Sequence, residues 1–163
     1  MTQSAYRLDE LDTALLELFR TEPRVGMLEA SRRLGVARGT VTARVDRMRT
    51  AGVVTGFGPD LDLKALGYSV LAFSILELAQ GRIHDVTNVL AAIPEVLEAH
   101  TIAGRGDLLI RIAARSNDHL MEIIEAILAS PHIARAETMI ALTSQIPLRT
   151  HSILRAVSRP SDP

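Results

Sequence analysis

The sequence contains no cysteine in its 163 residues. This absence excludes a disulfide framework, a zinc finger built on thiolates and a thiol nucleophile, and it fits a reducing compartment. Runs of about 18 apolar residues, which a membrane-spanning helix would need, are also missing. The first residues, MTQSAYRLDELD, are too polar for a signal peptide. We therefore expect a cytoplasmic protein with no membrane partner.

Spacings typical of metal ligands are missing as well. The histidines follow neither the HxxxH nor the HxH pattern; they stand at positions 84, 100, 119, 132 and 151. We therefore expect no metal site, no cofactor and no catalytic residue. What the chain does have is 47% hydrophobic residues, enough to form the core of one ordinary domain or of two small ones.

The overall charge of −1 conceals an uneven distribution. Residues 1–56 carry nine basic and seven acidic side chains, residues 57–142 carry six and eleven, and residues 143–163 carry three and one. The basic residues are densest from Arg32 to Val54, where Asp46 is the single acid among six arginines, at positions 32, 33, 38, 44, 47 and 49. A concentrated positive surface of this kind is typical of contact with nucleic acid.

Apolar spacing predicts three helices in the first third of the chain. Steps of three and four residues indicate a helix over 8–19, and shorter patterns indicate helices over 27–34 and 37–51. Gly35 and Gly52 stand where the second and third helices should end. Three helices with a four-residue turn between the last two form a helix-turn-helix.

The remaining sequence predicts strands and helices in the order β-α-β-β-α-β. Strands are expected at 68–78, 96–103, 108–114 and 133–142, and helices at 82–93 and 118–129. The segments PEVLEAHT and PHIARAET, 37 residues apart, repeat one pattern and support a ferredoxin-like unit. We therefore expect an α+β protein, divided into a DNA-binding domain (1–54), a linker strand or hinge (55–67), a ferredoxin-like domain (68–143) and a partly disordered tail (144–163).

The third predicted helix has an outer face suited to a major groove. If Val41, Val45 and Met48 face the core, small and hydrogen-bonding residues point outward between arginines. Small residues permit close approach, threonines can reach base edges and arginines can reach phosphates. A solvated helix face that only aids solubility is the alternative. The predicted DNA-binding residues are Arg38, Gly39, Thr40, Thr42, Ala43, Arg44 and Arg47.

The segment AGRGD, between two predicted central strands, is a candidate ligand loop. A turn flanked by glycines exposes backbone N–H groups that can bind a carboxylate, and Asp107 can pair with an ammonium group. Together these groups would suit an amino acid. The alternative from the residues alone is a hairpin in which the glycines supply positive φ and Asp107 caps the turn.

Several motifs in this order resemble the Lrp/AsnC family of bacterial transcription regulators. They are LDELDTALL (8–16), EASRRLGVARGTVTARVDRMRTAGVV (29–54), LGYSV (66–70) and AGRGDLLIRI (103–112). The resemblance implies an N-terminal helix-turn-helix (winged-helix-like) domain and a C-terminal ferredoxin-like βαββαβ (RAM) domain. It also implies binding to double-stranded DNA, regulation by a small effector such as an amino acid, and assembly into dimers, tetramers or octamers.

The resemblance also bears on individual residues. It matches Gly104 and Asp107 to the family's Gly-x-x-Asp effector loop and so favours effector binding there, with Arg105 and Thr138 nearby. Family members usually have serine where Ala37 stands. Alanine cannot cap the free N–H groups at the start of the third helix, which costs about 1 kcal/mol at most.

Two other functions stay open at this point. One is a nucleoid-like protein that binds DNA without an effector. The other is an enzyme similar to sirohaem decarboxylases, in which His100 would serve a tetrapyrrole. A coloured protein after purification would reveal the tetrapyrrole and hence the enzyme. A melting temperature that shifts with an added ligand would distinguish the regulator from the nucleoid-like protein.

The strand composition predicts self-association. The predicted strands have apolar residues on both faces, whereas the two helices of a ferredoxin-like domain cover only one face of its sheet. Pairing of two sheets across a two-fold axis would bury the other face and place two recognition helices on one particle. We therefore expect a dimer at least.

Overall fold

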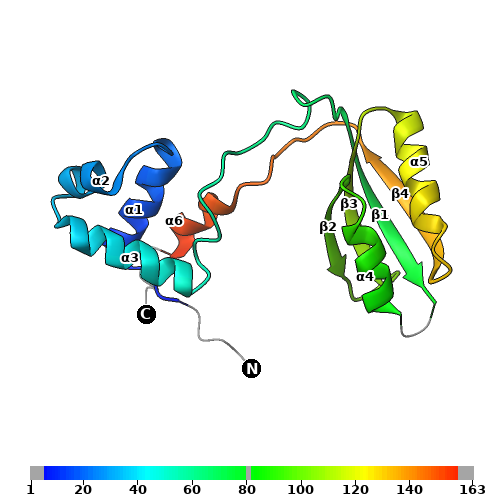
Figure 1. Ribbon diagram of the computed structural model, residues 1–163, viewed down its shortest axis with the longest axis horizontal. Coiled ribbons are helices and arrows are strands. Elements are labelled where there is room, and N and C mark those ends of the chain that lie inside the picture. The colour runs from blue at the N-terminus through cyan, green and yellow to red at the C-terminus, as the bar shows by residue number, and fades with distance from the viewer. Residues whose placement is uncertain (1–5, 80–81, 158–163) are drawn as a thin grey trace. The chain divides into compact units, whose positions relative to one another are not determined.

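The computed structural model describes residues 6–79 and 82–157 (Figure 1). The chain forms two compact units. One holds the chain up to Asp60 together with the tail from Pro147, and the other spans Leu61–Ile146. No helix in the described residues combines the length and the apolar character that crossing a membrane requires.

The first unit contains the three helices that the apolar spacing predicts. They are α1 (Glu10–Thr21), α2 (Met27–Leu34) and α3 (Arg38–Thr50). Helix α1 begins with a capping box, in which the side chains of Asp9 and Asp12 each accept a hydrogen bond from the other residue's backbone N–H. Helix α2 ends at Gly35, whose φ of 66° is the left-handed conformation that a glycine adopts without strain.

One buried cluster holds these three helices together. Its members come from one face of each helix and are almost fully buried: Leu15, Ala30, Val41, Val45 and Met48. Burial of large apolar side chains contributes roughly 1.5–3 kcal/mol each. The packing of α2 against α3 through Gly35 forms the helix-turn-helix.

The expected strand after α3 is absent. Residues 53–67 contain no strand in the structure. A strand requires a neighbour to pair with its backbone groups, and glycines together with Pro59 interrupt this segment. The segment instead connects the two units as irregular backbone with a short turn at 63–67.

The second unit is a four-stranded antiparallel sheet with two helices. The elements are β1 (Val70–Leu78), α4 (Ile83–Ala91), β2 (Val96–Thr101), β3 (Leu108–Ala114), α5 (Asn117–Leu128) and β4 (Ile133–Ala141). The strand order is β2-β3-β1-β4. The ferredoxin-like βαββαβ prediction is therefore confirmed.

Both helices of this unit cover the same face of the sheet. Their apolar residues join those of the strands in one cluster, which includes Ala72, Leu76, Ile110 and Ile112 from β1 and β3 and Val86, Leu90, Leu120, Ile123 and Ile127 from α4 and α5. Side chains alternate between the faces of a strand. The residues between these strand positions therefore lie on the opposite face, which α4 and α5 do not cover.

The tail returns to the first unit. It contains a 3₁₀ helix (η1, Thr150–Ile153) followed by a short helix (α6, Leu154–Val157). Thr150, His151 and Leu154 border a depression together with α1 and residues 53–58, where Phe57 stacks edge-on against Phe19 at 5.6 Å. The structure thus describes helical turns over 150–157, whereas residues 158–163 of the tail expected to be partly disordered lie outside the described part.

Candidate functional site

Helix α3 presents the outward face that the sequence predicts. Val41, Val45 and Met48 are 0–2% exposed and anchor the helix on its inner side. Because the helical repeat turns the intervening positions away from this core, six of the seven predicted DNA-binding residues are exposed: Arg38, Gly39, Thr40, Thr42, Ala43 and Arg47. The face thus combines small side chains with hydroxyl groups and cations.

The start of α3 lacks a side-chain cap. Ala37 occupies the N-cap position and makes no side-chain hydrogen bond, and the first turn contains no acid. Thr42 donates its hydroxyl hydrogen to the carbonyl of Arg38 at 3.2 Å, which fixes its rotamer and leaves its methyl group free to make contacts. The first turn of α3 therefore has no side-chain cap and no negative charge.

Arg44 lies among acidic partners on α1. Its Nη1 atom hydrogen-bonds to the Asp9 carboxylate and approaches the carboxylate of Asp12 at 3.2 Å. The side chain is 26% exposed. The sequence predicts a phosphate contact for this residue, whereas the structure shows it bridging α3 to α1.

Arg47 is tied to the same region but less tightly. Its Nε donates to the hydroxyl of Tyr6 at 2.9 Å, and its guanidinium group lies 5.7 Å from the centre of the Tyr6 ring. A weaker contact of 3.8 Å joins Nη2 to Asp12. Since 55% of the side chain stays exposed, Arg47 is oriented by Tyr6 and Asp12 but can still reach a ligand.

These contacts shift the pKa of two groups. The pKa of Asp9 is lowered, first by the hydrogen bond from the backbone N–H of Asp12 and then by the hydrogen bond from Arg44. The pKa of Arg44 is raised, chiefly by its hydrogen bond to Asp9 and then by that to Asp12. Both shifts favour the charged forms, so the bridge is an ion pair at neutral pH.

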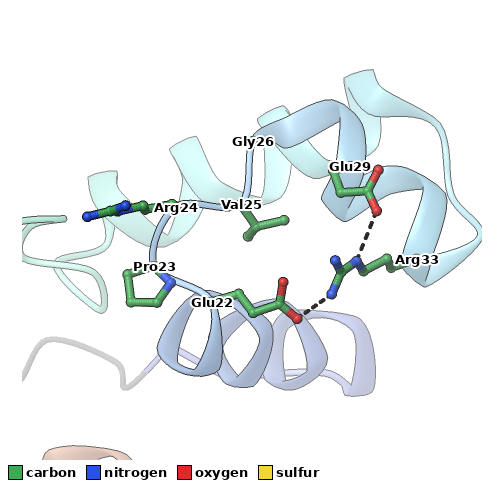
Figure 2. Close-up of a pocket in the computed structure, with 7 residues that line it drawn as sticks. All are labelled: Glu22, Pro23, Arg24, Val25, Gly26, Glu29 and Arg33. Carbon is green, nitrogen blue, oxygen red and sulfur yellow. Dashed lines mark hydrogen bonds and ion pairs between the residues drawn. The ribbon is translucent and has the colours of Figure 1, made fainter.

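Acids also bind an arginine of α2, as Figure 2 shows. Arg33 donates to Glu29 at 3.0 Å and to Glu22 at the end of α1. These residues border an open depression of about 530 Å³ beside Arg24 and Gly26. Arg33 therefore adds little free positive charge to the surface. The number of arginines between residues 32 and 54 could not reveal this pairing, because Glu22 lies 11 positions before Arg33 and outside that segment.

The AGRGD loop is tied to β1. The backbone N–H of Asp107 donates to the carbonyl of Leu76 at 2.9 Å, and the Asp107 carboxylate accepts from the N–H of Leu78 at 2.7 Å. Gly106, with φ of 82°, lies so close to β1 that an added Cβ would be 2.3 Å from a methyl group of Ile75. One oxygen of Asp107 thus has a structural role, and the carboxylate remains exposed.

The loop reaches β4 through one charged pair. Arg105 lies 3.3 Å from Glu137, next to Thr138 in sequence. The hydroxyl of Thr138 itself is 3.0 Å from that of the buried Ser74. The structure therefore brings Arg105 together with β4, whereas the Thr138 hydroxyl is engaged with β1.

Other chemistry is sparse in the part of the chain that the structure describes. No three acidic or histidine side chains come together there as metal ligands would. His100, the residue considered for a tetrapyrrole, is exposed on β2 beside Glu98 at 3.5 Å.

Two family models match this chain. The model for the AsnC-type helix-turn-helix domain matches residues 8–49, and the model for the Lrp/AsnC ligand binding domain matches residues 71–150. The first covers α1 to α3, and the second covers the sheet, its helices and the AGRGD loop.

Relatives match over nearly their whole length. The Regulatory protein AsnC of Escherichia coli is 33% identical over 145 residues, which are 86% of this chain and 94% of AsnC. The HTH-type transcriptional regulator FL11 of Pyrococcus horikoshii is 29% identical over 147 residues, which are 87% of this chain and 97% of FL11.

Solved structures share the fold. The structure of Escherichia coli AsnC gives a TM-score of 0.82 at 30% identity and covers 90% of this chain and 99% of its own. A transcriptional regulator from Neisseria meningitidis, solved as an L-Met complex, gives a TM-score of 0.78 at 19% identity. The match covers 88% of this chain and 95% of the Neisseria chain.

Proposed function

Because this chain belongs to the Lrp/AsnC family of transcriptional regulators, with a DNA-binding and a ligand-binding domain, we propose that it binds specific operators through α3. We propose further that a small amino acid or related metabolite biases its assembly or its DNA affinity. We propose a cytoplasmic location, in keeping with DNA as the partner.

The exposed face of α3 carries the DNA-binding proposal. In it, Arg38 and Arg47 contact phosphates, while Thr40 and Thr42 contact base edges. Gly39 and Ala43 allow the helix backbone to approach the groove closely, as their exposure permits. Arg44 acts mainly through its ion pairs with α1, which support the helix from behind.

A salt titration tests this assignment. A duplex selected from a random library by the wild-type protein is compared with a scrambled duplex by fluorescence anisotropy. Arg38→Ala should weaken binding to both duplexes and reduce the slope of log K against log salt by about 0.9. Thr40→Ala should instead alter the preference between the duplexes. Unchanged binding in both variants would remove α3 from the interface.

The AGRGD loop carries the effector proposal. Asp107 uses one carboxylate oxygen for the Leu78 N–H, which leaves the other for an ammonium group. Gly104 and Arg105 supply exposed backbone and a guanidinium group for a carboxylate. The L-Met complex of the Neisseria protein provides a precedent for an amino acid on this fold. Thr138 is a minor member of the proposed set, because its hydroxyl already contacts Ser74.

A screen of the amino acids by thermal shift tests the effector proposal, because a ligand stabilises the state that it binds. Calorimetry should then give a dissociation constant for each positive compound. If no amino acid or related metabolite shifts the melting temperature while DNA binding persists, the nucleoid-like alternative applies. We propose no enzymatic activity, in keeping with relatives that are named transcriptional regulators.

Self-association completes the proposal. The uncovered sheet face carries Phe73 and Ile75 of β1 and Leu109 of β3. Arg111, also on this face, pairs with Glu98 at 3.0 Å, but its buried Nε has no hydrogen-bond partner. A second copy would bury the apolar side chains and could satisfy this donor. We propose a dimer through this face, which larger assemblies of the family type can extend.

A further inference from the structure

Asp12 is the one charged side chain that is buried among the described residues, with an exposure of 0%. It lies in the first turn of α1, away from the outward face of α3. A buried carboxylate is costly unless several donors satisfy it. The groups that donate to the Asp12 carboxylate therefore indicate why this acid is buried.

The donors to Asp12 come from three places in the sequence. The backbone N–H of Asp9 donates at 3.4 Å and the hydroxyl of Tyr6 at 3.2 Å. From α3, Arg44 donates at 3.2 Å and Arg47 lies 3.8 Å away. Tyr6 also accepts a hydrogen bond from Arg47, so Asp12 contacts both arginines and Tyr6 adds a second contact to Arg47.

This arrangement affects the positive charge that DNA would meet. Arginines that contact phosphates add affinity without regard to sequence, whereas base contacts distinguish one sequence from another. An arginine held by a buried acid contributes less to the first effect. At the same time, the contacts from α1 fix the position of α3, on which the base-reading residues depend.

We propose that Asp12 is a positioning residue that sets sequence selectivity: together with Asp9 it withholds Arg44 from the DNA backbone, and it orients Arg47, which limits non-specific binding and fixes α3 for base contacts. The inference rests on the proposed binding of DNA by α3. Tyr6 assists by bridging Asp12 and Arg47.

A purely structural role for Asp12 predicts a different outcome. Loss of a structural ion pair would loosen α3 and weaken binding to every duplex. Release of the arginines would instead strengthen binding to scrambled DNA and steepen its salt dependence. The two possibilities therefore differ in the sign of one measurable change.

The test compares Asp12→Asn with Glu10→Gln in the full-length protein. Both variants remove one negative charge from the first turn of α1, but Glu10 is exposed and the structure records no ion pair for it in the described residues. The probes are a duplex selected by the wild-type protein and its scrambled version, measured by anisotropy from low to high salt. Circular dichroism checks that each variant is folded.

Asp12→Asn should bind the scrambled duplex several-fold more tightly at low salt, with a slope steeper by about 0.9 for each arginine that gains a phosphate. Its preference for the selected duplex should fall about tenfold, the loss of roughly one base contact. Glu10→Gln should change both quantities much less. Equal weakening on both duplexes with an unchanged slope, or the same steepening in Glu10→Gln, would overturn the inference.

Tyr6→Phe provides a second test that leaves every charge in place. It removes the hydroxyl that joins Asp12 to Arg47 but keeps the ring beneath the guanidinium group. The preference for the selected duplex should fall by a few-fold while the melting temperature changes little. An unchanged preference would overturn the inference even if Asp12→Asn cannot fold. Failure of the wild-type protein to bind any duplex would instead refute the proposed function itself.

Discussion

The Asp107 carboxylate accepts a 2.7 Å hydrogen bond from the backbone N–H of Leu78, at the end of β1. The Asp107 N–H donates in turn to the carbonyl of Leu76, and the two hydrogen bonds together close a small ring between the loop and the strand. The proposed effector site is therefore held against a central strand rather than on a free loop. A change at Asp107 affects both the loop geometry and the charge.

Asp107→Asn separates the two effects. The asparagine side-chain oxygen can still accept from the Leu78 N–H, but the negative charge for an ammonium group is gone. We expect nearly unchanged stability and DNA binding, with the calorimetric response to the effector lost. Asp107→Ala should in addition lower stability by about 1 kcal/mol, the typical value of such a bond. Unchanged effector affinity in Asp107→Asn would reduce this loop to a structural turn.

Gly106→Ala should destabilise the second unit much more than Gly104→Ala does. Both glycines have positive φ, 129° for Gly104 and 82° for Gly106, so each alanine introduces backbone strain. Gly104 has open space around it, whereas the new Cβ at Gly106 would lie 2.3 Å from Ile75. We expect a loss of about 1–2 kcal/mol for Gly104→Ala and about 3 kcal/mol or more for Gly106→Ala. Urea unfolding of the two variants measures the difference, and equal losses would contradict the close approach.

Sequence periodicity predicted the fold well because local patterns determine most of it. The α2 range of 27–34 and the β3 range of 108–114 agree with the structure residue by residue. The strand expected after α3 failed because a strand depends on a partner, which a local pattern does not specify. The helices of the tail were missed for a related reason: η1 and α6 are short and have too few turns to show a period.

The candidate site was less predictable, since side-chain partners lie far apart in sequence. Helical spacing placed Thr40 and Thr42 on the outside and Val45 on the inside, as observed. The same spacing could not show that Arg44 pairs with acids more than 30 positions earlier. The motif LDELDTALL contains both acids, so their spacing as a capping box was the one signal that marked them as structural.

Arg44→Ala should destabilise the first unit strongly. It leaves the fully buried Asp12 with one fewer cation, and breaking a buried pair costs about 3–5 kcal/mol. Arg47→Ala is the matched control, because its side chain is 55% exposed and its contact to Asp12 is 3.8 Å. We expect a cost of about 0–1 kcal/mol for that control. Hydrogen exchange of the α1 and α3 amides compares the variants, and equal protection in both would contradict a structural role for Arg44.

The lowered pKa of Asp9 makes the first unit sensitive to acid. A carboxyl group whose folded pKa lies below its unfolded value stabilises the fold above the unfolded pKa, and this contribution disappears as the pH falls through the folded pKa. Asp9→Asn keeps an N-cap acceptor but does not titrate. The melting temperature of the wild type should exceed that of Asp9→Asn well above 3.8, the ordinary pKa of an aspartate, and the two should converge as the pH falls through the lowered pKa of Asp9. A constant difference over this range would argue against the Arg44 bridge.

Leu109→Glu should prevent self-association. Leu109 lies opposite Ile75 in the register of β3 and β1, on the sheet face that α4 and α5 do not cover. Stable dimers commonly bury about 1,600 Å² in total, and a glutamate in the middle of such an interface would have to lose its hydration without a partner. We expect the wild-type protein to scatter light as a dimer or a larger multiple of 17.7 kDa, and Leu109→Glu to scatter as a monomer. Met121→Glu is the control, because Met121 is 58% exposed on α5 and its substitution should leave the assembly intact. A monomeric wild type at micromolar concentration, with or without amino acids, would refute the proposed dimer and with it the regulation by assembly.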